Sequence, residues 1–365
     1  MFIFFFSYFI YSENEDTSKV QILRTYEEKN LFYSVYEKDP TPKSKNSFVT
    51  IFGSEIEEDY DLLAPIVVLG NDLKKHSPEI DRILFVQTKN RFESSLHKYL
   101  SKFWTFIIYR PQLKWPEEID TTNYQTDLLF FIQLWTLQKY SKVLYIDPNT
   151  VIFSNITYAF NYPPPCGMLD DESTTLKAKG PYVSTTFFLF EPKMYEYIAL
   201  LLEAIKILQV GSYTTELEKH VINKYFLGRI CIFPSQIVQR SDDSYKKHPL
   251  MIRSMSLQFG LNSKPMSNDS ISYIEIWRDK YRSIYSQFGF PEQLKPLNQS
   301  FHKIQYQYIY PQIADVSLTN NSESIVYNLD SHKLVNNYVS FVLYSLVILY
   351  FGLENANSKE FIELI

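Results

Sequence analysis

Residues 135–156 read WTLQKYSKVLYIDPNTVIFSNI, and the centre of this stretch decides the fold. Residues 141–147 (SKVLYID) form a short apolar run with β-branched and aromatic side chains, which is typical of a buried strand. The preceding residues 128–140 (LLFFIQLWTLQKY) have the length and the apolar face of a helix. The pattern predicts a helix, a buried strand and then a carboxylate, Asp147, at the end of the strand.

The residues on the N-terminal side alternate between strand and helix patterns in the same way. Residues 47–53 (SFVTIFG) form an apolar run that ends at a glycine, which predicts a first buried strand. Residues 60–76 have helical spacing, and residues 82–87 (RILFVQ) and 104–109 (WTFIIY) predict two further strands. This order predicts an α/β fold that is Rossmann-like, with a central, mostly parallel sheet.

The pattern continues on the C-terminal side of the central stretch. Residues 183–190 (VSTTFFLF) predict another strand, and residues 193–208 and 215–226 predict helices. Beyond Lys264 the sequence is irregular and aromatic through residue 326, without a repeat period. We expect this part to pack onto the main domain as an extension.

Asp147, Pro148 and Asn149 occupy the place where α/β sheets bind ligands, beyond the carboxyl end of a strand. An acidic side chain there, with an oxygen donor two residues later, can hold a divalent ion that bridges a diphosphate. The same triplet is also an ordinary turn sequence. Both interpretations are open at this point.

The stretch 135–156 resembles the core segment of glycosyltransferase family 8, typified by glycogenin. That pattern is W-x-L-x-x-Y-x-K-x-x-(aromatic)-(hydrophobic)-D-x-D-T-x-(hydrophobic)-x-x-N-I, and the match is gapless. Residues 48–53 and 67–73 resemble the family's uridine-binding strand and the helix after it. The resemblance extends to about Pro265, and it implies a GT-A fold and a retaining hexosyltransferase that uses a UDP-sugar, usually with manganese.

The resemblance implies a metal site at three positions. Asp147 matches the first metal carboxylate, Asn149 stands in place of the second, and Gln258 stands in place of the histidine of H-x-x-G-x-x-K-P. The two amides still present carbonyl oxygens, but a site with one charge fewer holds a hard divalent ion less tightly. His248 competes with Gln258 for this role if a loop shifts the register.

The resemblance also implies residues that bind the nucleotide. Lys264 keeps the lysine of the same motif and would contact the diphosphate, although a solvated surface lysine is the alternative. Ile51, Gly53 and Tyr60 belong to the segment that resembles the uridine-binding part of the family. Together with Asp147, these residues are the expected contacts of the UDP-sugar.

Three further residues are expected near the transferred sugar, and we assign them catalytic roles. Asp170 lies at the family's spacing from the metal pair and matches a carboxylate near the donor sugar. Glu218 and Lys219 replace the family's Asp-Gln, and the added cation would partly take the ion's place in stabilising the departing UDP. Asp170 is followed by two more acidic residues, so a solvated acidic loop is the competing interpretation.

The composition excludes one class of partner and leaves another feature open. Lys and Arg number 36 against 41 Asp and Glu, with a pI near 5.8, so nucleic acid is not an expected partner. Only 9 glycines occur where average usage of about 7% would give roughly 25, which indicates altered ligand loops or a drift in composition. Cys166 and Cys231 are the two cysteines, so one disulfide is allowed but not required.

Both ends of the chain carry apolar segments. Residues 1–12 (MFIFFFSYFIYS) resemble a short signal peptide without its basic region, or else an unusually apolar first strand. Residues 334–353 carry no charge and just suffice for a tilted membrane helix, although a buried or surface-docked helix fits as well. We expect the protein to enter the secretory pathway, in the lumen, at the cell surface or secreted, with membrane anchoring left open.

The expected organisation combines these features. In chain order the segments are a signal peptide (1–12), a polar lead (13–45), a GT-A domain (46–266), an extension (267–333), a membrane or buried helix (334–353) and a tail (354–365).

Three functional hypotheses follow from the altered motifs. The first is a hexosyltransferase that moves a sugar from a UDP-sugar to a glycan or protein acceptor. The second is an inactive relative kept as a binding or scaffold protein, because Phe131 replaces a cationic residue and residues 184–186 replace Asn-Ser-Gly. The third is a membrane-anchored surface protein whose function lies in the aromatic C-terminal segment.

Overall fold

The computed structural model describes residues 40–53, 63–87, 92–110, 131–170, 182–210, 217–241, 251–252, 256–259, 272–291 and 307–308. All of them belong to residues 1–321, the first of two units into which the chain divides. The expected signal peptide, the apolar segment 334–353 and the tail lie outside the described residues, as do most of the polar lead and of the region 292–333.

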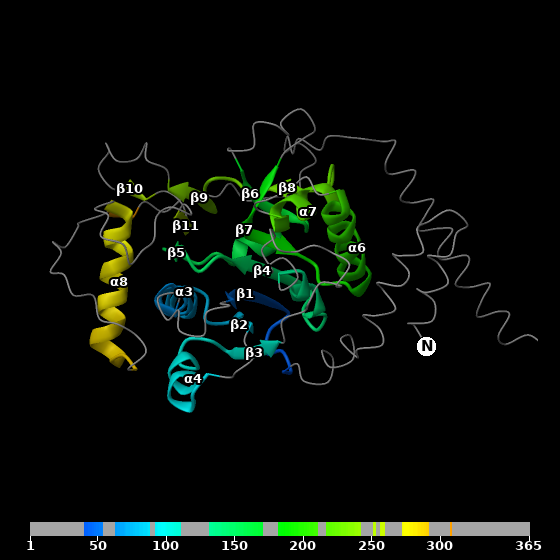
Figure 1. Cartoon of the computed structure of the whole chain (residues 1–365). Coiled ribbons are helices and arrows are strands. Elements are labelled where there is room, and N and C mark those ends of the chain that lie inside the picture. Colours follow the sequence, from blue (N-terminus) through cyan, green and yellow to red (C-terminus); the bar gives the residue numbers. More distant parts are fainter. Residues whose placement is uncertain are drawn as a thin grey trace, which may run out of the picture. The chain divides into compact units, whose positions relative to one another are not determined.

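A seven-stranded sheet forms the centre of the described fold, in the order β3-β2-β1-β4-β7-β6-β8 (Figure 1). Its strands are β1 (Asn46–Gly53), β2 (Asp81–Gln87), β3 (Phe106–Arg110), β4 (Lys142–Ile146), β6 (Cys166–Leu169), β7 (Val183–Phe190) and β8 (Cys231–Ile232). The strands predicted at 47–53, 82–87, 104–109, 141–147 and 183–190 are all present, with ends that differ by at most two residues.

The sheet is mostly parallel. β1 pairs in parallel with β2 and β4, and β2 pairs in parallel with β3. β7 is antiparallel to both of its neighbours, β4 and β6. The carboxyl ends of β1, β4 and β6 therefore lie at the same edge of the sheet as the amino end of β7. This edge is where Gly53, Asp147 and Asp170 end or follow their strands.

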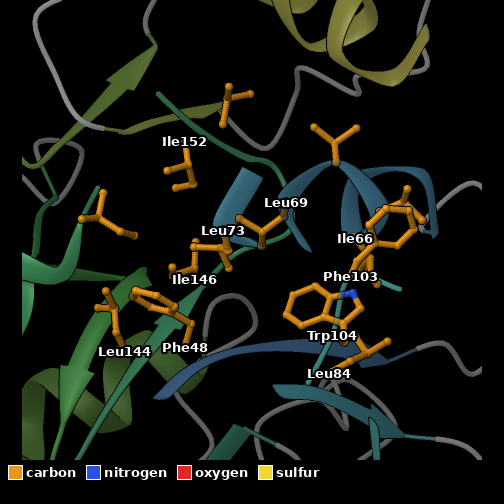
Figure 2. Close-up of a cluster of buried hydrophobic side chains, with 14 of the residues drawn as sticks. Phe48, Ile66, Leu69, Leu73, Leu84, Phe103, Trp104, Leu144, Ile146 and Ile152 are labelled. Atoms are coloured by element: carbon orange, nitrogen blue, oxygen red, sulfur yellow. The ribbon is translucent and has the colours of Figure 1, made fainter. Parts of the chain in front are cut away.

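Alternating side chains of the strands fill two cores, one on each face of the sheet. In β4, for example, Leu144 and Ile146 belong to one core, and Val143 and Tyr145 belong to the other. Successive residues of a strand point to opposite faces, so a run that is apolar at every position is buried on both. Figure 2 shows the first core, where Leu144 and Ile146 lie with Phe48, Leu73 and other apolar side chains.

Helices cover both faces. The first core is closed by α3 (Leu63–His76) and α4 (Ser94–Leu100), and the second by α6 (Met194–Val210), α7 (Leu217–Tyr225) and the 3₁₀ helix η3 (Gln133–Thr136). The helix predicted at 128–140 is thus short in its described part, where residues 131–132 are α-helical and η3 follows.

In the region beyond Lys264, which was expected to pack onto the main domain, the structure describes a regular helix that was not predicted. α8 (Ser272–Phe288) buries Trp277, Tyr281 and Ile284 in the first core, and Phe288 packs against it. These four residues have spacings of four, three and four, which is one face of a helix. The sequence contains this spacing, but further aromatic residues within and around the helix, such as Tyr285 and Phe290, do not follow it.

Short elements complete the described fold. A three-stranded sheet has the order β5-β11-β9, with β5 (Thr150–Ile152), β9 (Val238–Ser241) and β11 (Ser256–Phe259). A two-stranded sheet joins β10 (Met251–Ile252) to β12 (Gln307–Tyr308). The 3₁₀ helix η4 (Thr157–Asn161) follows β5.

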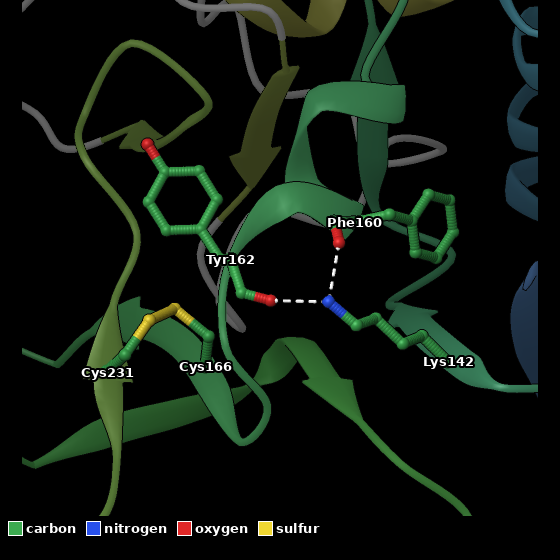
Figure 3. Close-up of a disulfide and its surroundings, with 5 residues drawn as sticks. All are labelled: Lys142, Phe160, Tyr162, Cys166 and Cys231. Atoms are coloured by element: carbon green, nitrogen blue, oxygen red, sulfur yellow. Dashed lines mark hydrogen bonds between the residues drawn. A yellow bond between two sulfur atoms is a disulfide. The ribbon is translucent and has the colours of Figure 1, made fainter. Parts of the chain in front are cut away.

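A disulfide joins Cys166 to Cys231, so the bridge that the sequence allowed is formed (Figure 3). It links β6 to β8 at the edge of the central sheet. Nearby, the ammonium of Lys142 donates hydrogen bonds to the carbonyls of Phe160 and Tyr162, at 2.7 and 2.9 Å. These contacts fasten the segment between β5 and β6 against the sheet.

Candidate functional site

Asp147 follows β4 at the ligand-binding edge predicted from the sequence. Its backbone N–H donates to the carbonyl of Thr186 on β7, at 2.7 Å. Its side-chain Oδ1 accepts the backbone N–H of Asn149 at 2.8 Å, and its carbonyl accepts the N–H of Thr150 at 3.1 Å. The turn interpretation of Asp-Pro-Asn therefore describes the backbone correctly, and the turn holds the carboxylate at the end of the strand.

Burial changes the pKa of the Asp147 carboxylate. Desolvation raises the pKa of Asp147 to about 6, although the hydrogen bonds from Asn149 work in the opposite direction. The side chain is half-buried. An acid with this pKa is partly protonated in mildly acidic solution. A cation that approaches it favours the ionised form of the carboxylate.

The neighbouring strand β1 is tied to β4 at the same edge. The hydroxyl of Thr50 donates to the carbonyl of Ile146 at 2.7 Å. Ile51 is half-buried and packs against the second core, and Gly53 is the last residue of β1. The strand that resembles the uridine-binding segment thus ends beside the strand that carries Asp147. Tyr60 lies outside the described residues.

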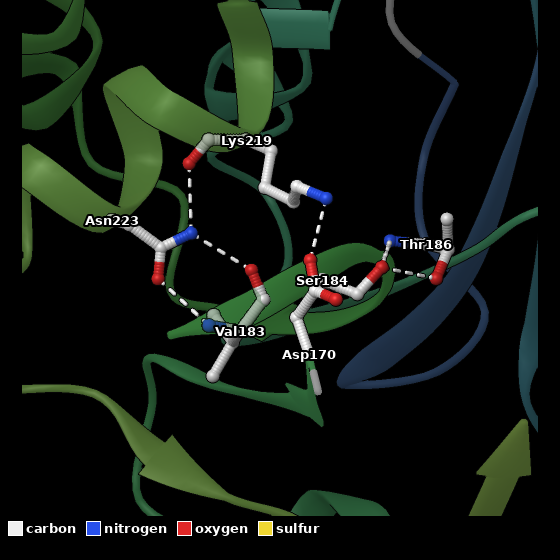
Figure 4. A network of polar contacts seen from close by, with 6 residues as sticks. All are labelled: Asp170, Val183, Ser184, Thr186, Lys219 and Asn223. Carbon is white, nitrogen blue, oxygen red and sulfur yellow. Dashed lines mark hydrogen bonds and ion pairs between the residues drawn. The ribbon is translucent and has the colours of Figure 1, made fainter. Parts of the chain in front are cut away.

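Asp170 and Lys219 meet at this edge (Figure 4). Lys219 Nζ lies 2.5 Å from Asp170 Oδ2, and the two side chains are 9% and 1% exposed. The backbone N–H of Asp170 donates to the carbonyl of Tyr182 at 2.9 Å, and the Lys219 ammonium lies over the Tyr182 ring. Asp170 is therefore a buried, ion-paired residue, and the interpretation as a solvated acidic loop is wrong.

The remaining polar groups of this edge belong to β7. The hydroxyls of Ser184 and Thr186 lie 2.7 Å apart in a hydrogen bond, and Figure 4 shows them beside Asp170. The carbonyl of the same Thr186 receives the N–H of Asp147. Tyr182, directly before β7, accepts the N–H of Asp170, so the backbone at the amino end of β7 contacts the backbone of both Asp147 and Asp170.

Sequence reasoning missed Asn223, which fixes the helix that carries Lys219. Its Oδ1 accepts the N–H of Val183 at 2.8 Å, and its Nδ2 donates to the carbonyls of Val183 and Lys219, both at 2.8 Å. A buried amide that both accepts and donates imitates one residue of a neighbouring strand. The signal that could have found it is a polar residue next to the apolar pair Val221 and Ile222.

For Gln258, Glu218, Lys264 and His248, the structure describes only part of the residue's position or none of it. Gln258 lies on β11 and pairs in register with Thr150 of β5, so its backbone lies beside the turn that follows Asp147. Nothing further is described of its side chain. Glu218 lies in the first turn of α7 and is half-buried. Lys264 and His248 lie outside the described residues.

The donor set for manganese is weak in the described part of the chain. Asp147 offers one carboxylate, whose Oδ1 accepts the backbone N–H of Asn149, while the Asp170 carboxylate is already paired with Lys219. Among the described residues there is no group of three or more His, Cys, Asp or Glu side chains that could hold a metal ion. Oxygen donors suit manganese, but a site with a single formal negative charge binds the ion only weakly.

Comparisons with known protein families and with curated proteins give no match. Among solved structures, the bifunctional glycosyltransferase WbbM aligns over 68% of this chain and 53% of its own, with a TM-score of 0.51 and 13% identity. The galactosyltransferase LgtC, solved with donor and acceptor sugar analogues, aligns over 68% and 98%, with a TM-score of 0.48 and 12% identity. The glycosyltransferase GlyE of Streptococcus pneumoniae aligns over 70% and 67%, with a TM-score of 0.48 and 15% identity.

The alignment with WbbM bears on the fold. This chain spans about half of the WbbM chain, and the identity is too low to carry more than architecture. The expected α/β fold of the GT-A type, with its mostly parallel central sheet, is confirmed.

Proposed function

We propose that this protein is a retaining hexosyltransferase, similar to glycogenin and other members of glycosyltransferase family 8, that moves a sugar from a UDP-sugar to a glycan or protein acceptor. The observation that carries the proposal is the position of Asp147 at the carboxyl end of β4, joined through Thr186 to the edge where Asp170 and Lys219 meet. In α/β sheets this edge is where ligands bind.

The proposed roles follow from charge and position. Asp147 faces the diphosphate side of the donor, and Ile51, Gly53 and Tyr60 contact the nucleotide. Lys264 contacts the diphosphate. Lys219 supplies a buried positive charge that stabilises the departing UDP. Asp170 holds that ammonium in place, and Glu218 orients the sugar or the acceptor.

Manganese is part of the proposal as a weakly bound ion. Asp147, Asn149 and Gln258 would hold it through oxygen atoms, and the bound ion would neutralise charge on the diphosphate. One carboxylate gives less affinity than two. The chain's own cation, Lys219, then carries a larger share of the stabilisation.

Binding of UDP tests the first proposal directly. We expect millimolar UDP with manganese to raise the melting temperature, because a ligand that binds the native state stabilises it. Asp147→Ala should abolish most of this shift, while Asp279→Asn, which alters a half-buried ion pair on α8, should retain it. Absence of a shift in the unaltered protein at millimolar UDP would contradict the proposal.

A second candidate is a catalytically silent relative that keeps the fold as a binding or scaffold protein. The observation that favours it is the ion pair of Lys219 with Asp170, whose carboxylate is 1% exposed and already engaged. Hydrolysis of UDP-glucose separates the two candidates. Turnover that disappears in Asp147→Ala identifies the enzyme, whereas UDP binding without hydrolysis or transfer identifies the scaffold.

We also propose that the protein works in the secretory pathway or at the cell surface. The disulfide between Cys166 and Cys231 supports this, since such bridges persist in oxidising compartments. Among the helices that the structure describes, none is long and apolar enough to cross a membrane. Anchoring through residues 334–353 is a separate proposal, which alkaline carbonate extraction tests.

A further inference from the structure

Another ion pair, between a buried carboxylate and a half-buried ammonium, lies outside the residues assigned above. Lys280 of α8 donates to both carboxylate oxygens of Asp72 on α3, at 2.9 and 2.8 Å. The Asp72 side chain is 3% exposed and that of Lys280 is 17% exposed. The pair joins two helices that are 208 residues apart in sequence. It therefore links the region beyond the resemblance to the helix after the first strand.

The pair also contacts the backbone of one residue, Ile152 at the end of β5. Asp72 Oδ2 accepts the N–H of Ile152 at 3.2 Å, and Lys280 Nζ donates to the carbonyl of Ile152 at 2.9 Å. The N–H and C=O of one strand residue point to the same side. The carboxylate and the ammonium together satisfy both, as a neighbouring strand would.

β5 lies at the edge of its sheet, so this contact replaces a missing strand. The order is β5-β11-β9, and β11 covers the other side of β5. The three residues of β5 begin directly after the Asp147–Asn149 turn, and Thr150 pairs in register with Gln258. All three residues of β5 are buried, and Val151 and Ile152 pack in the first core, so Asp72 and Lys280 add polar contacts at the one edge of β5 that no strand covers.

From these contacts we infer that Asp72 and Lys280 are positioning residues, which hold β5 so that the Asp147–Asn149 turn stays beside Gln258. They act through Ile152 and do not touch the ligand. The inference rests on the proposed function, because the site that they position is the proposed UDP site.

Two neutral double variants separate this role from simple loss of a charge. Asp72→Asn with Lys280→Met keeps an amide that can accept from the N–H and donate to the C=O of Ile152, as Asn223 does at Val183. Asp72→Leu with Lys280→Met has similar volume and charge but offers neither. The control, Asp279→Asn, alters a half-buried ion pair one residue from Lys280.

The first measurement is amide hydrogen exchange, which needs no ligand. In the Leu–Met variant we expect exchange over residues 147–153 to rise about tenfold, with β1 and β2 unchanged, because local opening is confined to β5. The Asn–Met variant and the control should exchange as the unaltered protein does. Equal exchange in the two double variants, or a rise spread evenly over the central sheet, would overturn the inference.

The second measurement is the affinity for UDP with manganese by calorimetry. We expect about a tenfold loss in the Leu–Met variant, since residues that orient a site typically change affinity by that much. The Asn–Met variant should stay within about threefold of the unaltered protein. Equal affinities in both variants would overturn the positioning role. If the unaltered protein binds no UDP, the proposed function fails, and hydrogen exchange alone decides whether the pair holds β5.

Discussion

At the scale of single residues, Asp147 lies at the proposed site and has a cost in stability. Desolvation raises its pKa from 3.8 to about 6, so ionisation is less favourable in the folded protein than in the unfolded chain. The protonated form buries no charge, so its favourable contribution to the free energy of unfolding is fully present below the pKa of 3.8 in the unfolded chain. It is lost as the pH rises through 6, where the proposed site needs the carboxylate charged.

Asp147→Asn should therefore stabilise the protein in a pH-dependent way. Asparagine keeps the acceptor for the Asn149 N–H and stays neutral. At pH 7.5 we expect the free energy of unfolding to increase by about 2 kcal/mol, less than the roughly 3 kcal/mol that the full pKa shift implies, because the side chain keeps some contact with water. Urea denaturation at pH 7.5 and near pH 4 checks this, and a gain that is equal at both values would contradict it.

At the scale of secondary-structure elements, polar side chains form hydrogen bonds with strand backbones that a neighbouring strand would usually form. Asn223 covers Val183 at the amino end of β7, and Asp72 with Lys280 covers Ile152 at the end of β5. In both cases the element carries or borders a proposed site residue. α7 carries Lys219, and β5 follows the Asp147–Asn149 turn.

Asn223→Ala should loosen α7 from the sheet. The change removes three hydrogen bonds and leaves buried backbone groups without partners, so we expect a loss of about 3 kcal/mol in the free energy of unfolding. The neighbouring Lys224→Ala removes a partly exposed pair with Glu203 and should lower the free energy of unfolding by less than about 1 kcal/mol. Urea denaturation compares the two, and similar losses would contradict the assigned role of Asn223.

At the scale of the whole molecule, the disulfide closes a long part of the chain. Cys166 and Cys231 are separated by 65 residues, and the segment between them contains β7, α6 and α7. A bridge that closes such a segment restricts the unfolded chain far more than the folded one. It therefore stabilises the folded state as a whole, and the segment that it closes includes Lys219 on α7.

Removal of the bridge should destabilise the protein without changing the chemistry of the site. We expect the double variant Cys166→Ala with Cys231→Ala to lose about 4 kcal/mol of unfolding free energy, from the length of the closed segment. A reducing agent should lower the melting temperature of the unaltered protein and leave that of the double variant unchanged. Thermal denaturation with and without reductant checks this, and equal sensitivity of both proteins would contradict it.

The sequence by itself determined five of the seven central strands, all but the short β6 and β8, and the end of β4 where Asp147 lies. Apolar runs, their lengths and the glycine or acidic residues that end them are local properties, and burial on both faces makes such runs continuous. α8 shows the limit of such local patterns, since its apolar spacing is present in the sequence but lies among other aromatic residues that do not follow it.

Only the tertiary structure decided which polar groups meet. Asp170 and Lys219 were both named from the sequence, but their pairing depends on β7 running antiparallel between β4 and β6. Asp72 and Lys280 are 208 residues apart, and no local pattern relates them. A buried charge or amide is stable only beside its partner, and the order of strands and the packing of helices determine where that partner lies.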